Sequence, residues 1–273
     1  MPTRSSPKAE PPPLRLLAGT SGWSYEAWKG PFYPAALPAR DMLAFYAAVL
    51  PCVEVNQTFY RMPKPEVLAG WAAQVPDGFR FALKAPRRIT HLKRLRDVGE
   101  DVAWLLRTAA ALGPKLGALL VQTPPNLALD LERLDGFLAL LPEGTPAAFE
   151  PRHPSWHDDA VFARLRARGF AFVAADVDGA PPPPLVSTAP WAYLRLRRSG
   201  YGGSDLARWL DVLRAAGPRL AFAFFKHEDE GAAPRFAREL LALAGAAPPL
   251  RAGARAARAE PARAAPRARR PRR

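Results

Sequence analysis

Eight short apolar runs recur along the chain, and most of them are followed by a segment with helical periodicity. Strands that alternate with helices pair in parallel, because each helix carries the chain back to the start of the next strand. The eight runs are RLLAG, CVEVN, FRFALKAP, ALLVQ, AAFEPR, AFVAADV, AYLRLR and AFAFFKH. This alternation predicts an α/β domain of the TIM (β/α)8 type.

One of the eight units departs from the pattern. Four prolines occupy residues 181–184, after the sixth run, and no helical period appears before the seventh. Proline removes a backbone donor and clashes with the preceding turn of a helix. We therefore predict a barrel with a degenerate sixth helix, in which an extended connection replaces that helix.

The composition supports one domain with two disordered ends. A chain of 273 residues that is 49% apolar can bury one sizeable core, which we place in a barrel domain at residues 14–245. Residues 1–13 and the Arg/Ala/Pro-rich tail at residues 246–273 lack the composition of a core and are predicted to be disordered.

The net charge of +14 is concentrated in that tail. Residues 251–273 contain nine arginines and one glutamate, so eight of the net positive charges lie there. Such a tail can bind nucleic acid non-specifically through phosphate neutralisation, or it can be a solvated extension.

The sequence also bears on the cellular compartment. Cys52 is the single cysteine, so no internal disulfide can form. The sequence starts without the apolar run of a signal peptide, and no stretch approaches a membrane span. We expect a soluble, cytoplasmic protein without a membrane partner.

Polar side chains end nearly all of the predicted strands. In TIM barrels, sites lie at the C-terminal ends of the strands. Glu54 and Asn56 are two residues apart, so on a strand they point to the same face. The polar residues at these ends are Glu54, Asn56, Lys84, Gln122, Glu150, Arg152, Asp176, Arg195, Arg197, Lys226 and His227.

Three carboxylates at these ends are candidate catalytic groups. Glu54 and Glu150 come from strands on roughly opposite sides of the barrel, which suits acid and base roles across a bound molecule, and Asp176 joins them. A structural alternative stays open, in which Glu54 pairs with Lys84 and Glu150 pairs with Arg152 or another arginine.

The remaining strand ends favour an anionic ligand, such as a phosphate or carboxylate, because positive charges predominate among them. Nearby aromatic side chains suit stacking on a sugar ring or base, although they can equally pack over the barrel. The residues expected to bind the substrate are Asn56, Lys84, Gln122, Arg152, His153, Arg195, Lys226, Trp23 and Tyr60.

No metal ligands are assigned, and the cofactor stays unknown. Of the four histidines only His153 and His227 lie near strand ends, so a site for three zinc ions is not expected. A single divalent ion held by Glu54, Glu150, Asp176 and His153 stays open as an alternative. Cys52 lies at the start of its strand and is predicted to belong to the core.

Five motifs resemble one known family. GTSGWSY, VEVNQTFYRMP, FRFALKAPRRITH, LLVQTPP and FEPRHPSW are similar to motifs of the domain-of-unknown-function family 72, the YecE-like proteins. The resemblance extends from about Leu17 to Leu243 and implies a TIM barrel, distantly similar to the endonuclease-four and xylose-isomerase barrels, but no particular reaction. The eighth strand departs from the family pattern, with FFKHED where many relatives have Phe-Asn-Asn-Asp.

These observations lead to three hypotheses. The first is an enzyme, a hydrolase or a lyase/isomerase, that uses carboxylate acid-base chemistry on a small or oligomeric anionic substrate. The second is a nucleic-acid-binding or nuclease-like protein that uses the basic mouth and tail. The third is a binding scaffold without catalysis.

Overall fold

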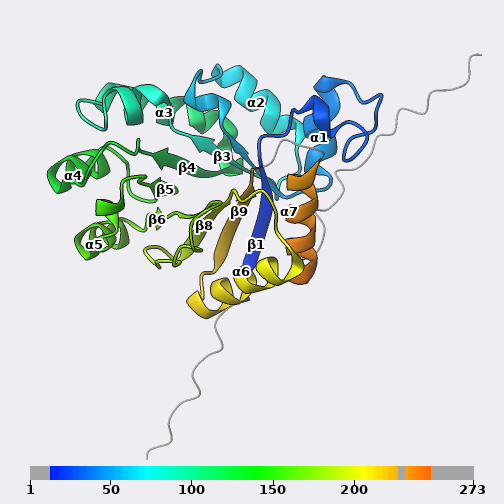
Figure 1. The fold of residues 1–273 in the computed structure, drawn as a ribbon. Helices are drawn as coiled ribbons and strands as arrows, with labels where there is room; N and C mark the ends of the chain where they lie inside the picture. Colours follow the sequence, from blue (N-terminus) through cyan, green and yellow to red (C-terminus); the bar gives the residue numbers. More distant parts are fainter. Residues whose placement is uncertain (1–12, 227–230, 247–273) are drawn as a thin grey trace, which may run out of the picture.

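The computed structural model describes residues 13–226 and 231–246. Its strands form one parallel sheet with the order β6-β5-β4-β3-β2-β1-β9-β8-β7, surrounded by helices (Figure 1). The strands are β1 (Arg15–Ser21), β2 (Cys52–Val55), β3 (Arg80–Lys84), β4 (Leu116–Gln122), β5 (Ala147–Glu150), β6 (Ala171–Phe172), β7 (Ala174–Asp176), β8 (Trp191–Leu196) and β9 (Leu220–Phe225). The fold is therefore the predicted TIM-type barrel.

The sixth predicted strand is divided into β6 and β7, with Val173 between them. β6 pairs with β5, whereas β7 pairs with β8. The Val173 N–H donates to the Phe149 carbonyl at 2.9 Å, which continues the pairing across the break. Because these consecutive segments occupy the two ends of the sheet order, the barrel is nearly closed.

Seven helices cover the outside of the barrel in the described part of the chain. They are α1 (Met42–Ala47), α2 (Pro65–Gln74), α3 (Gly99–Ala109), α4 (Leu131–Ala139), α5 (Asp159–Arg168), α6 (Gly203–Ala216) and α7 (Ala232–Leu243). Residues 177–190, between β7 and β8, contain no helix, as the proline run predicts. Short 3-10 turns lie at Glu26–Trp28, Ala39–Asp41, Gln57–Phe59, Ala110–Lys115 and Pro154–Trp156, and a π turn at Arg88–Leu92.

Local signals in the sequence set several helix ends. The Asp130 side chain accepts a hydrogen bond from the Arg133 N–H at 2.9 Å, and Asp158 accepts one from the Ala160 N–H at 2.8 Å. These bonds satisfy backbone donors that have no partner inside α4 and α5. Gly217 ends α6 with a φ of 65°, a left-handed conformation that glycine adopts without strain.

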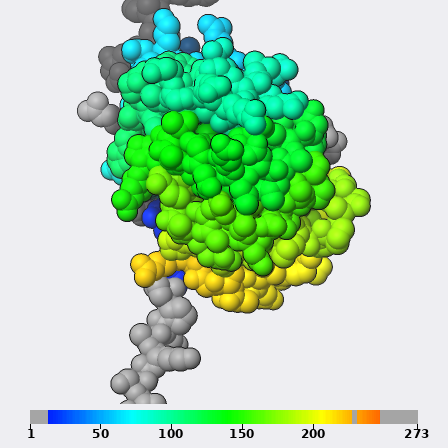
Figure 2. Space-filling view, turned by 90° about the vertical axis from the view of Figure 1, so that its left-hand side faces the viewer, coloured from blue at the N-terminus to red at the C-terminus, as the bar shows by residue number. Residues whose placement is uncertain are grey.

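The core has two layers, one between strands and helices and one inside the barrel. The inner layer is filled by the larger side chains Leu17, Cys52, Leu120, Val173, Tyr193, Phe222 and Phe224. Cys52 is fully buried there, and burial raises the pKa of its thiol, which supports the predicted core role. On the side of the molecule that carries α3, α4 and α5, the surface colours run from cyan through green to yellow, in chain order (Figure 2).

Within the described residues, none of the helices combines the length and apolar character needed to cross a bilayer. The two predicted disordered segments lie outside the described residues, apart from residues 13 and 246. His227 lies outside them too.

Candidate functional site

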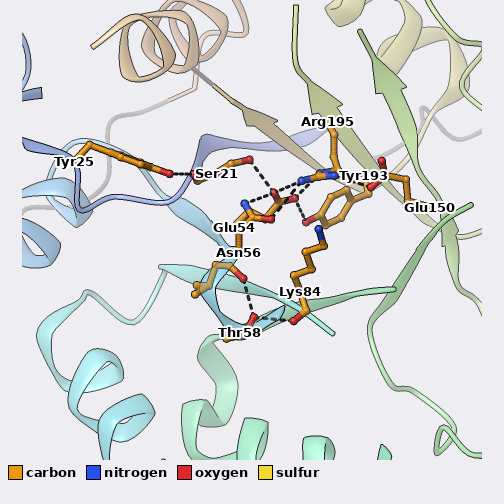
Figure 3. A network of polar contacts seen from close by, with 10 residues as sticks. Ser21, Tyr25, Glu54, Asn56, Thr58, Lys84, Glu150, Tyr193 and Arg195 are labelled. Atoms are coloured by element: carbon orange, nitrogen blue, oxygen red, sulfur yellow. Dashed lines mark hydrogen bonds and ion pairs between the residues drawn. The ribbon is translucent and has the colours of Figure 1, made fainter. Parts of the chain in front are cut away.

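A buried ion bridge spans the C-terminal end of the barrel. Arg195 of β8 donates from Nε to Glu54 Oε2 at 2.9 Å and from Nη2 to Glu54 Oε1 at 2.8 Å, and its Nη1 donates to Glu150 Oε2 at 2.8 Å (Figure 3). Glu54 comes from β2 and Glu150 from β5, so three separated strands meet here. We call these three residues the Arg195 bridge.

Glu54 is saturated with hydrogen bonds. Besides Arg195, it accepts from Ser21 Oγ at 2.8 Å, from Tyr193 OH at 2.8 Å and from Asn56 Nδ2 at 3.0 Å. Burial raises the pKa of this carboxyl, but the attraction of Arg195 and the hydrogen bonds outweigh burial and lower the pKa to about 2. Glu54 is therefore held as a carboxylate, which is costly to protonate.

Glu150 keeps one oxygen outside the bridge. Its Oε2 pairs with Arg195, whereas its Oε1 accepts no hydrogen bond from any residue that the structure describes. Arg195 stays charged: burial lowers the pKa of its guanidinium, but Glu54 and Glu150 raise the pKa by more. The two carboxylates therefore differ, since Glu54 is fully engaged and Glu150 is not.

Lys84 ends β3 and extends toward the Arg195 bridge (Figure 3). It is half-buried, and its Nζ lies 4.3 Å from the centre of the Phe59 ring. Among the described residues its ammonium forms no ion pair or hydrogen bond. Burial and the nearby Arg195 lower the pKa of Lys84 to about 8, against the opposing effect of the two glutamates.

Further positive groups lie around Lys84. Arg197 is partly buried, and the described residues supply no ion pair for it; burial, Arg195 and Arg152 lower the pKa of its guanidinium. Burial and the charges of Lys84, Arg87 and Arg152 lower the pKa of His91 in the same way. Burial is the largest cause of both shifts, and the neighbouring positive charges add to it.

Gln122 adds an unused donor. It ends β4 directly beside Glu150 in the sheet register and is 3% exposed. Its Nε2 has no hydrogen-bond partner in the described part of the protein. A buried amide without a partner is unusual and marks a place where a ligand oxygen would be stabilised.

A pocket of about 160 Å³ lies beside the network, between the loops that follow β1 and β2. Its lining residues are Gly22, Trp23, Ser24, Tyr25, Val55, Asn56 and Gln57. Asn56 belongs to both the pocket and the network, since its amide donates to Glu54. The polar cluster therefore has space next to it.

The sequence places most of these residues correctly, with two differences. Asp176 does not join the cluster: its Oδ2 accepts from Trp209 Nε1 at 3.0 Å and from Tyr201 OH at 3.2 Å, on the helix side of β7. Val173 belongs to the core cluster inside the barrel. Side chains alternate along a strand, so Asp176, three residues later, points outward. Glu54 forms a buried ion pair, as the structural alternative predicts, but the partner of Glu54 is Arg195 and not Lys84.

The other predicted contacts lie further out. Arg152 and Lys226 are exposed, and Tyr60 is 81% exposed. His153 Nδ1 lies 2.7 Å from Ser155 Oγ. Trp23 lines the pocket and packs edge-on against Trp71, so its packing is observed and its contact with a ligand stays a prediction.

The residues considered as ligands for one divalent ion do not form a metal site. Arg195 lies between Glu54 and Glu150, and Asp176 points away from them. In the described ranges no group of three or more His, Cys, Asp or Glu side chains is arranged to hold a metal ion.

Sequence reasoning missed Ser21, Tyr193 and His91, and it considered Phe59 only as one of the aromatic side chains in the loops. Tyr193 is two residues before Arg195, so strand alternation alone places both on the inner face. Ser21 is directly opposite Glu54 in the register of β1 and β2, which the sequence does not specify. Phe59 and His91 follow strands in loops, where the sequence gives no periodic signal.

Comparisons with known proteins agree on one family. The sequence model described as "Protein of unknown function DUF72" matches residues 17–261. The UPF0759 protein YecE of Escherichia coli strain K12 is 38% identical over 142 residues, which cover 52% of this chain and 50% of that protein. The chain thus spans about half the length of the curated relatives it matches.

Solved structures give the same result. A DUF72 family protein from Thermotoga maritima MSB8 superposes with a TM-score of 0.73 at 27% identity, over 84% of this chain and 98% of the other. One from Enterococcus faecalis V583 reaches a TM-score of 0.70 at 22% identity, over 85% and 96% of the two chains, and shows the fold alone. The match to the family's sequence model confirms the resemblance carried by the five motifs, and the chain belongs to the DUF72 family.

Proposed function

We propose that the mouth of the barrel binds a small anionic substrate and catalyses proton transfer on it, as an isomerase or lyase would. The observation that carries the proposal is a set of unused donors beside the Arg195 bridge. Lys84 and Arg197 are partly buried without an ion pair among the described residues, and the Gln122 amide has no partner there.

Electrostatics explains why an anion fits. A partly buried cation without a counterion has lost hydration and gained little in return. Glu54 is fully engaged and Glu150 gives one oxygen to Arg195, and among the described residues neither carboxylate pairs with Lys84 or Arg197. A phosphate or carboxylate group would form charge-assisted hydrogen bonds with Lys84 and Arg197.

The arrangement also supports acid-base chemistry. The pKa of Lys84, about 8, lets it both hold and release a proton near neutral pH. The free oxygen of Glu150 is the second proton-transfer group in the proposal. Glu54 then serves as the anchor of Arg195, and Asn56 and Gln122 orient the substrate.

Binding of inorganic phosphate and of a panel of sugar phosphates, measured by isothermal titration calorimetry, tests the proposal. We expect Lys84→Met and Arg197→Met each to weaken binding by about tenfold or more, the cost of one charge-assisted contact. Arg164→Met is the matched control, because Arg164 of α5 pairs with Asp135 at the surface, at 2.7 Å. Equal affinities in all four proteins would contradict an anion site at the mouth.

A second proposal concerns nucleic acid and rests on sequence alone. The nine arginines of residues 251–273 can neutralise phosphates without any contribution from the barrel. This segment lies outside the described residues, so the two proposals concern separate parts of the chain.

A further inference from the structure

We propose that Lys84 is a nucleophile, which forms an imine with an aldehyde or ketone that also carries a phosphate or carboxylate group. The inference rests on the anion site proposed above and specifies its substrate class. It assigns to the site covalent chemistry, which anion binding and proton transfer do not require.

The first argument is that Lys84 is deprived of carboxylate partners. A lysine beside two glutamates normally forms an ion pair and is then unreactive. Here Glu54 accepts hydrogen bonds from Arg195, Ser21, Tyr193 and Asn56. Arg195 holds Glu54 on both oxygens and Glu150 on one, and in the described part of the chain the amine of Lys84 forms no ion pair with either glutamate.

The second argument is the environment of the amine. Phe59 presents its ring to Nζ at 4.3 Å; the ring excludes water from one side of the amine, while its face also attracts the ammonium as a cation–π partner. Arg195 and Arg197 place positive charges nearby. Desolvation and neighbouring cations are the two conditions that keep a lysine neutral and nucleophilic.

The pKa is consistent with this geometry. With a pKa of about 8, roughly a tenth of the Lys84 side chains are neutral at pH 7. Lys84 is half-buried and therefore still reachable from the mouth.

The proposed step balances without an oxidant or reductant. The lone pair of neutral Nζ attacks the carbonyl carbon, and one amine proton moves to the carbonyl oxygen to give a carbinolamine. The hydroxyl group then leaves as water together with the second amine proton, and the imine nitrogen takes one proton from solvent. The unused Gln122 amide would donate to the carbonyl oxygen, and Arg197 would bind the anionic group.

Trapping with borohydride tests the inference on the chain of 273 residues. Pyridoxal 5′-phosphate and 5′-deoxypyridoxal are the matched probes, because both carry the same free aldehyde and only one carries phosphate. After reduction, peptide mapping measures the label on each lysine. Lys226 is the internal control, since it also follows a strand of the barrel but is exposed.

We expect pyridoxal 5′-phosphate to label Lys84 at least about tenfold faster than Lys226 at pH 7, as the larger neutral fraction predicts. The labelling rate of Lys84 should level off above pH 8, near its pKa of about 8, and not continue to the ordinary lysine value of 10.5. Inorganic phosphate and Arg197→Met should slow labelling by pyridoxal 5′-phosphate but not by 5′-deoxypyridoxal.

The outcomes separate this inference from the proposed function. Phosphate binding that depends on Lys84 and Arg197, without reduced adduct on Lys84, would overturn the imine and leave the anion site standing. Rapid labelling of Lys84 by both probes, insensitive to phosphate and to Arg197→Met, would support the nucleophile and overturn the anion site. Labelling of Lys84 no faster than Lys226 would refute the nucleophile in either case.

Discussion

At the scale of single residues, the Arg195 bridge separates two carboxylates that look alike in the sequence. Glu54 is bound on both oxygens, whereas Glu150 is bound on one. Replacing Glu54 removes two of the three hydrogen bonds between Arg195 and carboxylates and leaves Arg195 with Glu150 alone. Breaking a buried ion pair costs about 3–5 kcal/mol. We therefore expect Glu54→Gln to lower the free energy of unfolding by roughly that amount, measured by urea denaturation.

The control for this substitution is an ion pair at the surface. Asp135 pairs with Arg164 at 2.7 Å, but its side chain is 52% exposed. Exposed pairs contribute about 1 kcal/mol or less, so Asp135→Asn should change stability little. If Glu54→Gln and Asp135→Asn lowered the free energy of unfolding by similar amounts, the Arg195 bridge would stabilise the fold no more than a surface ion pair does.

The pH dependence of the same Glu54→Gln variant gives a second readout. The pKa of Glu54 is about 2 in the folded protein and 4.5 in an ordinary glutamate. Its carboxylate therefore stabilises the fold above pH 4.5, by about 3 kcal/mol, and this contribution is lost as pH falls toward 2. Because the glutamine side chain of the variant cannot titrate, the difference in stability between the two proteins should shrink over this pH range. A difference that stays constant there would contradict the role of Glu54 as a charged anchor.

At the scale of the elements, the sequence predicts the barrel because the apolar pattern of its strands and the helical periodicity between them are both clear. Apolar strands and amphipathic helices alternate, and the run of prolines marks the place without a helix. The sequence does not predict the split of the sixth strand, since β6 and β7 belong to one continuous run and are told apart by their pairing partners. Pairing partners are set by closure of the whole barrel.

The site was predictable where alternation fixes which side chains face inward. Glu54, Lys84, Gln122 and Arg195 all follow from strand position. The orientation of Asp176 does not follow from strand position. Apolar residues occupy both faces of AFVAADV, so either face could be the inner one. The choice of Arg195 as the partner of both glutamates depends on the reach of its side chain across the barrel, which no local pattern encodes.

Gly19 of β1 shows how tightly two elements of the site approach each other. A Cβ atom at this position would collide with the Cys52 carbonyl oxygen of β2. Gly19→Ala must therefore displace one strand, and overpacking of this kind costs about 1–3 kcal/mol. Since Ser21 follows on the same strand and binds Glu54, we also expect weaker phosphate binding, measured by calorimetry.

Gly70→Ala is the matched control for this substitution. Gly70 lies inside α2, and no atom is within 4 Å of the added Cβ position. Alanine is a better helix former than glycine, so this variant should gain about 0.5–1 kcal/mol. Equal changes in stability from Gly19→Ala and Gly70→Ala would show that the close approach of β1 to β2 is not constrained.

At the scale of the whole molecule, positive charge is concentrated in two separate parts of the chain. The barrel concentrates cations at its mouth around the Arg195 bridge, where burial limits screening by salt. Residues 251–273 carry nine arginines in a composition that is not that of a core. Anion binding by the barrel and nucleic-acid binding by the tail should therefore respond differently to salt.

Deleting residues 251–273 tests this separation. Affinity for a single-stranded oligonucleotide, measured by fluorescence anisotropy, should fall steeply with salt in the full chain and far less in the shortened one. If every arginine of the tail contacts a phosphate, the slope of log K against log salt changes by up to roughly 6. Affinity for inorganic phosphate should be unchanged by the deletion, because the mouth is left intact. An oligonucleotide affinity that survives the deletion but is lost in Lys84→Met would place nucleic-acid binding at the barrel instead.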